Sequence, residues 1–136
     1  MSVSKTEDVA RALLDSMRSG DLAGALATIT DDCVIRASTA LPWGGERVGQ
    51  EGFSGILQTM GTLFAADIHS YEVFADGDVA IVRAQTTFTS RSTGQATPMA
   101  IAEIYRIRDG RIAEMDVYYK DPQVIGALAD YLEPAQ

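Results

Sequence analysis

Two runs of alternating apolar and polar residues, joined by Asp109-Gly110, place the strongest constraint on the fold of this chain. A type I′ turn needs positive φ at both central residues, and Asp-Gly is among the pairs that adopt it most readily. We therefore predict a β-hairpin formed by residues 98–107 and 112–119. The hairpin places one carboxylate, Glu103, in the middle of an apolar strand, where an ionised group needs a partner or a function.

The remainder of the chain predicts helices first and strands afterwards. Three segments have apolar residues at helical spacing: residues 4–20, 22–29 and 50–64. Alternation predicts three further strands, at residues 33–38, 68–74 and 79–90, and the tail predicts a short helix from Val124 to Tyr131. Segregated helices and consecutive hairpins indicate an α+β fold, with a curled antiparallel sheet wrapped around the N-terminal helices. We expect a pocket between them.

Charge and composition exclude several classes of partner. The net charge of −8 and the sequence pI of about 4.4 argue against binding to nucleic acids or to anionic membranes. The only cysteine, Cys33, excludes an intrachain disulfide. No apolar run approaches the ~20 residues that span a bilayer, and the N-terminus has no signal-peptide pattern. We expect residues 1–136 to form one cytoplasmic domain.

Four short motifs in a fixed order carry a family resemblance. They are Ser19-Gly20-Asp21-Leu22, Thr30-Asp31-Asp32-Cys33-Val34, Arg47-Val48-Gly49-Gln50-Glu51-Gly52-Phe53, and the hairpin sequence from Tyr105 to Ile112. Together they resemble the nuclear transport factor 2-like superfamily, which includes ketosteroid isomerases and SnoaL-like polyketide cyclases. The resemblance implies a cone-shaped α+β fold, a pocket for a small apolar molecule, chemistry without a cofactor, and homodimers.

Most of the catalytic residues of ketosteroid isomerases have no counterpart in this chain. The aspartate base of ketosteroid isomerases aligns with Ala37, and their catalytic tyrosine aligns with Leu13. Their protonated aspartate aligns with Glu103, so steroid isomerase activity is not expected. Related cyclases and epoxide hydrolases use acidic residues with an arginine, for which this chain offers Glu103, Arg83 and Asp116 without a complete Asp-Arg-Asp set.

Strand alternation selects the candidate catalytic residues. It places Glu103 on one face with Ile101 and Tyr105, and on the next strand it places Met115, Val117 and Tyr119 on one face. If these faces line the cone, burial raises the pKa of Glu103 and makes it an acid or base, with Tyr119 as a pocket hydroxyl and Tyr105, Met115 and Val117 as ligand contacts. The alternatives are an outward Glu103 paired with an arginine, and a Tyr119 that only packs.

Three further residues are ligand-binding candidates, each with a structural alternative. Trp43 lies in a glycine-rich loop and either closes the mouth of the cone or anchors the loop on the third helix. His69 either faces the pocket as an acid–base group or tethers the sheet. Arg83 either holds a ligand or pairs with Glu103, unless a one-residue register shift turns it outward. One histidine and one cysteine do not make a metal site, so none is predicted.

Three functions remain open. The first is a cofactor-free isomerase, cyclase or hydrolase that uses Glu103. The second is a non-catalytic binder with the same pocket. The third is association through the outer face of the sheet, predicted to contain Val34, Arg36, Ile104, Arg106, Ile112, Asp116 and Tyr118.

Overall fold

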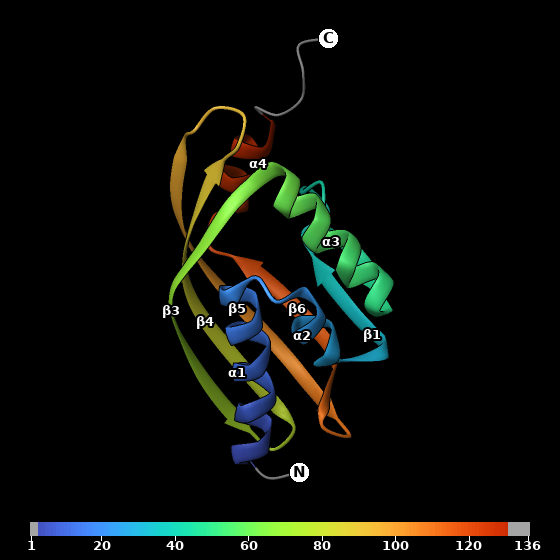
Figure 1. Cartoon of the computed structure of the whole chain (residues 1–136). Coiled ribbons are helices and arrows are strands. Elements are labelled where there is room, and N and C mark those ends of the chain that lie inside the picture. The colour runs from blue at the N-terminus through green and yellow to red at the C-terminus, as the bar shows by residue number, and fades with distance from the viewer. Residues whose placement is uncertain (1–2, 131–136) are drawn as a thin grey trace.

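A computed structural model describes residues 3–130 and shows four helices and six strands within them (Figure 1). In chain order they are α1 (Val3–Ser19), α2 (Leu22–Ala27), β1 (Ile29–Ala37), β2 (Gly45–Val48), α3 (Gly49–Leu63), β3 (Phe64–Asp76), β4 (Val79–Ser90), β5 (Ala96–Arg108), β6 (Arg111–Tyr119) and α4 (Pro122–Asp130). Tyr131, the last residue of the predicted tail helix, lies outside the described range. None of the helices among residues 3–130 combines the length and the apolar character that a membrane-spanning helix needs.

The N-terminal helices form as their sequence predicts. Leu13 and its neighbours on one side of α1 are buried, and the helix ends at Gly20, whose φ of 73° is readily adopted by glycine. Asp21 then caps α2, because its carboxylate accepts a hydrogen bond from the Gly24 N–H at 2.9 Å.

The sheet has the strand order β2-β1-β6-β5-β4-β3 and remains open. Strands β3 to β6 form the predicted antiparallel meander, and the Asp109-Gly110 turn has positive φ at both residues. The predicted α+β fold with a curled sheet is confirmed. The sheet is mixed and not antiparallel throughout, because β1 pairs with β6 in parallel. The chain leaves β1 through β2 and α3, crosses to the far edge, and returns along the meander until β6 lies beside β1.

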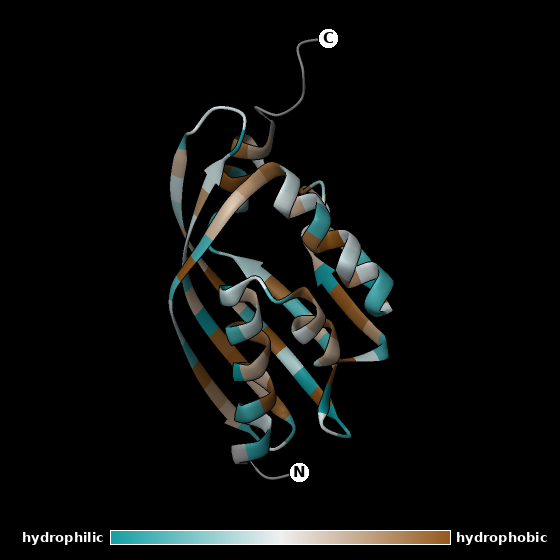
Figure 2. Ribbon diagram, in the orientation of Figure 1, coloured by the Kyte–Doolittle hydropathy of each residue, from teal (hydrophilic) through white to brown (hydrophobic). Residues whose placement is uncertain are grey.

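The sheet curls around the helices, and its inner face forms the core with them (Figure 1). Hydrophobic and hydrophilic residues alternate along the strands (Figure 2), as expected for a sheet with one buried face. On β4 the even-numbered residues from Ala80 to Ser90 are buried, so the odd-numbered ones point outward.

Two irregularities change which residues face the core. The register of β3 shifts between Ile68 and Ser70, so that residues 64, 66 and 68 and then 71 and 73 face inward, with His69 at the shift. A second shift opposite Arg106 and Ile107 turns Ile112 inward. Ile112 is completely buried, so its predicted place on the outer face is wrong.

Candidate functional site

A cavity of about 480 Å³ lies between the curled sheet and helices α1, α2 and α3. Its volume falls in the range of small-molecule sites. Most of its lining is apolar, and within the described chain only three lining residues are charged: Asp21, Arg91 and Glu103. A ligand for this cavity therefore has a mainly apolar body.

Glu103 lies on the inner face of β5 and lines the cavity, as predicted. Its neighbours across the sheet are Val82 on β4 and Val117 on β6, which offer no charge. Removal of the carboxyl from bulk water raises the pKa of Glu103, and a hydrogen bond from the Tyr105 hydroxyl to its Oε1 partly opposes that rise. The group therefore stays protonated to a higher pH than an exposed glutamate.

Tyr105 supports Glu103 and does not line the cavity itself. It is completely buried, and burial raises its pKa well above that of a free tyrosine, so its hydroxyl stays a donor. Tyr105 was predicted to contact the ligand. In the structure it contacts Glu103 instead and holds that carboxyl group in position.

Trp43 anchors its loop inside the protein. Its side chain is 1 % exposed, lines the cavity, and packs edge-on against Phe64 at 5.6 Å and Tyr119 at 6.0 Å between ring centroids. Its Nε1–H donates to the Tyr119 hydroxyl at 2.9 Å. Of the two predictions for Trp43, the structural anchor agrees with its burial.

Tyr119 lines the cavity together with Met115 and Val117, as alternation on β6 predicts. Its hydroxyl lies 3.9 Å from the Met60 sulfur, a weak acceptor, and burial raises its pKa. The hydroxyl is therefore a neutral donor that a better acceptor can recruit.

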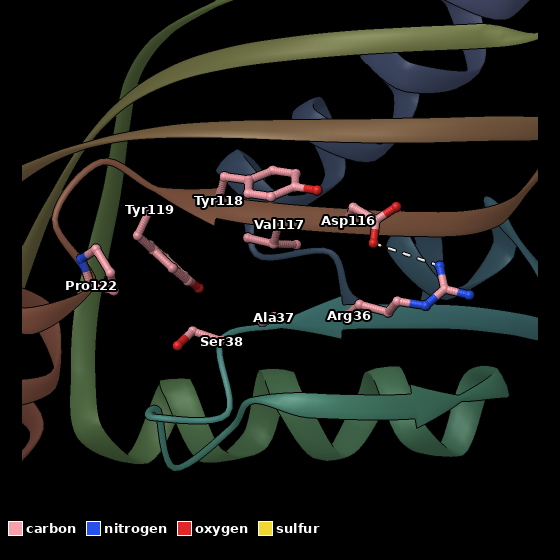
Figure 3. Close-up of a pocket in the computed structure, with 8 residues that line it drawn as sticks. All are labelled: Arg36, Ala37, Ser38, Asp116, Val117, Tyr118, Tyr119 and Pro122. Atoms are coloured by element: carbon pink, nitrogen blue, oxygen red, sulfur yellow. Dashed lines mark ion pairs between the residues drawn. The ribbon is translucent and has the colours of Figure 1, made fainter.

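A smaller crevice of about 340 Å³ lies where β1 and β6 end (Figure 3). In Figure 3, Tyr118 and Tyr119 project to opposite sides of β6, and Asp116 pairs with Arg36 at 3.6 Å. Ala37, which aligns with the isomerase base, lines both the crevice and the cavity. The base position thus reaches the cavity but carries no acid.

Two predicted ligand contacts lie outside the site. Arg83 is on the outer face of β4, 63 % exposed, and pairs across the sheet with Glu72 at 3.7 Å, so it contacts neither the cavity nor Glu103. His69 is exposed because the register shift removes it from the inward alternation, and its Nε2 lies 2.6 Å from the Thr87 hydroxyl. This contact agrees with the structural alternative for His69.

Residues 10–115 match the profile of the SnoaL-like domain. This chain belongs to the SnoaL-like family. No curated protein sequence matches this SnoaL-like protein. The predicted relationship to the nuclear transport factor 2-like superfamily is confirmed.

Solved structures share the fold of this SnoaL-like protein. A putative polyketide cyclase from Xanthomonas campestris pv. campestris is 19 % identical, with a TM-score of 0.83 over 93 % of this chain and 98 % of that one. TerC, co-crystallised with polyporic acid, is also 19 % identical, with a TM-score of 0.84 over 93 % and 98 %. An NTF2-like protein from Burkholderia xenovorans LB400 is 19 % identical, with a TM-score of 0.79 over 88 % and 92 %.

Thr86 and Arg91 are among the cavity residues of the SnoaL-like domain that were not predicted from the sequence. Thr86 lines the cavity from β4 between Ile68 and Met99, and its hydroxyl is the one buried side-chain polar atom without a partner among the described residues. The sequence did contain a signal for Thr86, because it occupies a position that alternation along β4 otherwise gives to apolar, inward-facing residues. Arg91 follows the end of β4, where no pattern marks it as a cavity residue.

The substitution Thr86→Val should raise the free energy of unfolding by about 1 kcal/mol, because a buried hydroxyl without a partner costs stability. Chemical denaturation of the wild-type and variant proteins measures this change. Thr89→Val, on the outer face of the same strand, is the matched control and should change stability little. A loss of stability in Thr86→Val would show that the hydroxyl has a partner.

Proposed function

We propose that this SnoaL-like protein binds a small, largely apolar molecule in its cavity and converts it by acid–base chemistry without a cofactor, as an isomerase, cyclase or hydrolase. One observation carries the proposal: Glu103 is a carboxyl group in an apolar cavity, with its pKa raised by burial. Such a group can transfer protons near neutral pH.

The contacts assign a role to each group. Tyr105 donates to Oε1 of Glu103 and holds the carboxyl in place, while Oε2 has no hydrogen bond within residues 3–130. Protonated Glu103 gives its proton to a ligand oxygen as negative charge develops there. The resulting carboxylate then accepts a proton from another atom of the ligand as the product forms, which restores the protonated Glu103. Tyr119 can donate to the same oxygen by giving up its weak contact with the Met60 sulfur.

Structures with the same fold support a small-molecule ligand. TerC was co-crystallised with polyporic acid, and the Xanthomonas protein is described as a putative polyketide cyclase. At 19 % identity these structures support only a shared fold. The proposed chemistry therefore depends on Glu103 and the residues around it.

The substitution Glu103→Gln should raise thermal stability at pH 8 and change it little at pH 4. Burial raises the pKa of Glu103 above its unfolded value, so the folded protein loses stability as the pH rises through the folded pKa. Glutamine cannot ionise and escapes that loss, about 1.4 kcal/mol for each unit of pKa difference. Thermal melts at both pH values measure the effect.

The control is Glu72→Gln, on the exposed outer face beside Arg83. It should show no such gain at pH 8. An equal effect of Glu103→Gln at pH 4 and pH 8 would show that Glu103 does not have a raised pKa.

Turnover separates an enzyme from a binder. In a panel of small apolar enones, epoxides and polycyclic quinones, a substrate of the wild-type protein should react about 10²–10⁴-fold more slowly with Glu103→Gln. Binding that survives the substitution without any turnover would support the second candidate, a non-catalytic binder. Ala37 favours that candidate, because the known base position has no acid.

The outer face of the sheet supports a proposal about assembly. Phe74, Ile81, Ile104 and Tyr118 are exposed there, and apolar surface of this kind is common where proteins associate. We propose a homodimer through this face. Sedimentation of the wild-type protein and of Ile104→Lys tests it, and a wild-type monomer at all concentrations would contradict it.

A further inference from the structure

Arg91 is the only basic residue that lines the cavity within the described part of the chain. It directly follows β4 and lies against the C-terminal end of α3. Four other lining residues are also exposed: Gln58 and Gly61 on α3, and Gly20 and Leu22 where α1 meets α2. These exposed residues mark the mouth of the cavity, so Arg91 lies at the mouth and Glu103 in the interior.

The Arg91 side chain is held in place but its charge is not neutralised. Its Nε–H donates to the Gly61 carbonyl at 2.7 Å, and its main-chain N–H donates to the Leu63 carbonyl at 3.0 Å. Residues 3–130 contain no carboxylate paired with Arg91, whereas Arg83 pairs with one carboxylate and Arg106 with two. The dipole of α3 stabilises a cation at its C-terminus. The contact with Gly61 uses only one of the five N–H donors of the guanidinium, so the other donors remain available to a ligand.

The protein around Arg91 does not favour anions in general. The net charge is −8, and Asp21 lines the same cavity, although its carboxylate already accepts the Gly24 N–H. A ligand anion therefore needs a local cation to bind. A guanidinium matches a carboxylate with two parallel hydrogen bonds, which makes Arg91 suited to that group.

The path along β4 between Arg91 and Glu103 sets an upper limit on the length of the ligand. Val82, which pairs with Glu103, is separated from Arg91 by roughly 30 Å of fully extended β4, and the curl of the sheet shortens that path. Thr86, with its unpartnered hydroxyl, and Phe88 lie between them on the same inner face. The cavity thus has a cation at its mouth, an apolar wall with one hydroxyl, and an acid inside.

We propose that Arg91 selects ligands with a carboxylate, so that the ligand is an elongated apolar molecule with its carboxylate at the mouth and its reacting end at Glu103. This inference rests on the proposed function, because it assumes that the cavity binds the ligand. The Thr86 hydroxyl can serve an oxygen in the middle of the molecule. Rotation about its Cα–Cβ bond breaks no hydrogen bond in the described structure.

The test uses two fluorescent probes of equal length, 11-(dansylamino)undecanoic acid and its methyl ester. The wild-type protein should bind the acid about 10-fold more tightly than the ester, as a hydrogen-bonded charge pair provides. Arg91→Gln should remove this preference by weakening the binding of the acid and not that of the ester. Arg91→Lys should keep part of the preference. Arg83→Gln, on the outer face, is the control and should keep the preference.

Each outcome separates this inference from the proposed function. Equal binding of acid and ester by the wild-type protein, or an unchanged preference in Arg91→Gln, would overturn the role of Arg91 and leave a binding cavity. Binding of neither probe would overturn both for ligands of this length. A preference that depends on Arg91, together with pH-independent effects of Glu103→Gln, would support the carboxylate site and contradict the acid–base function.

Discussion

Replacement of Trp43 by alanine is expected to lower the free energy of unfolding by about 3–5 kcal/mol, the usual cost of removing a large buried aromatic side chain. Trp43 is 1 % exposed, and its ring closes an edge-to-face cluster with Phe64 and Tyr119. The substitution also removes the hydrogen bond from Nε1 to the Tyr119 hydroxyl. Urea denaturation at neutral pH measures the loss.

Trp43→Phe should cost less, since it retains most of the apolar contact and loses the hydrogen bond. Val124→Ala is the control for loss of an exposed apolar side chain, because Val124 is 40 % exposed and lies on α4, outside the proposed dimer face. It should change stability by less than about 1 kcal/mol. A loss in Trp43→Ala as small as that in Val124→Ala would contradict the anchoring role.

The second large effect is expected for Gly44→Ala. A Cβ at this position would lie 1.7 Å from the main-chain carbonyl oxygen of Ser38, and a backbone atom cannot rotate away as a side chain does. The loop must move, at a cost of about 3 kcal/mol or more, and Trp43 moves with it. The change is measured by thermal unfolding and by the fluorescence of the only tryptophan.

The matched control is Gly61→Ala, because a Cβ there meets no atom within 4 Å and alanine favours the helix α3. That variant should gain about 0.5–1 kcal/mol. If Gly44→Ala unfolds like the wild-type protein and keeps its tryptophan fluorescence, the close approach between Ser38 and Gly44 is wrong.

Local sequence patterns predicted most elements of the fold. Helical spacing predicted α1, α2 and α3, and alternation with turn residues predicted the meander of β3 to β6, because both signals depend on residues close in the chain. The family resemblance, based on four short motifs, correctly indicated the SnoaL-like fold. These motifs mark turns and helix starts, which the same local chemistry determines.

The pairing of distant segments was not predictable in the same way. Residues 33–38 were predicted to form a strand, but no local signal shows that β1 lies parallel to β6. Strand β2 was missed because its four residues lie within a glycine-rich loop. The register shift at His69 also left no mark in the sequence, and it reversed the facing of that residue.

The candidate site was predicted where strand alternation is regular. Glu103, Met115, Val117 and Tyr119 lie on the predicted cavity face of β5 and β6. Arg83 was misplaced because the facing of β4 could not be assigned without its register. Arg91 was missed because its position depends on how the end of β4 meets α3 in three dimensions.

During synthesis, β1 leaves the ribosome long before β6. Strand β6 is the one through which β1 joins the rest of the sheet. The register pairs Ile29 with Ile112 and Ile35 with Met115, so most of the chain must be made before these contacts exist. Pairings across such long loops form slowly, because the loss of chain entropy precedes the gain from contacts. Until then β1, β2 and α3 have no sheet to dock on, and the apolar side chains that later line the cavity stay open to other chains. Closure of the cavity is therefore tied to the last strand of the nascent protein.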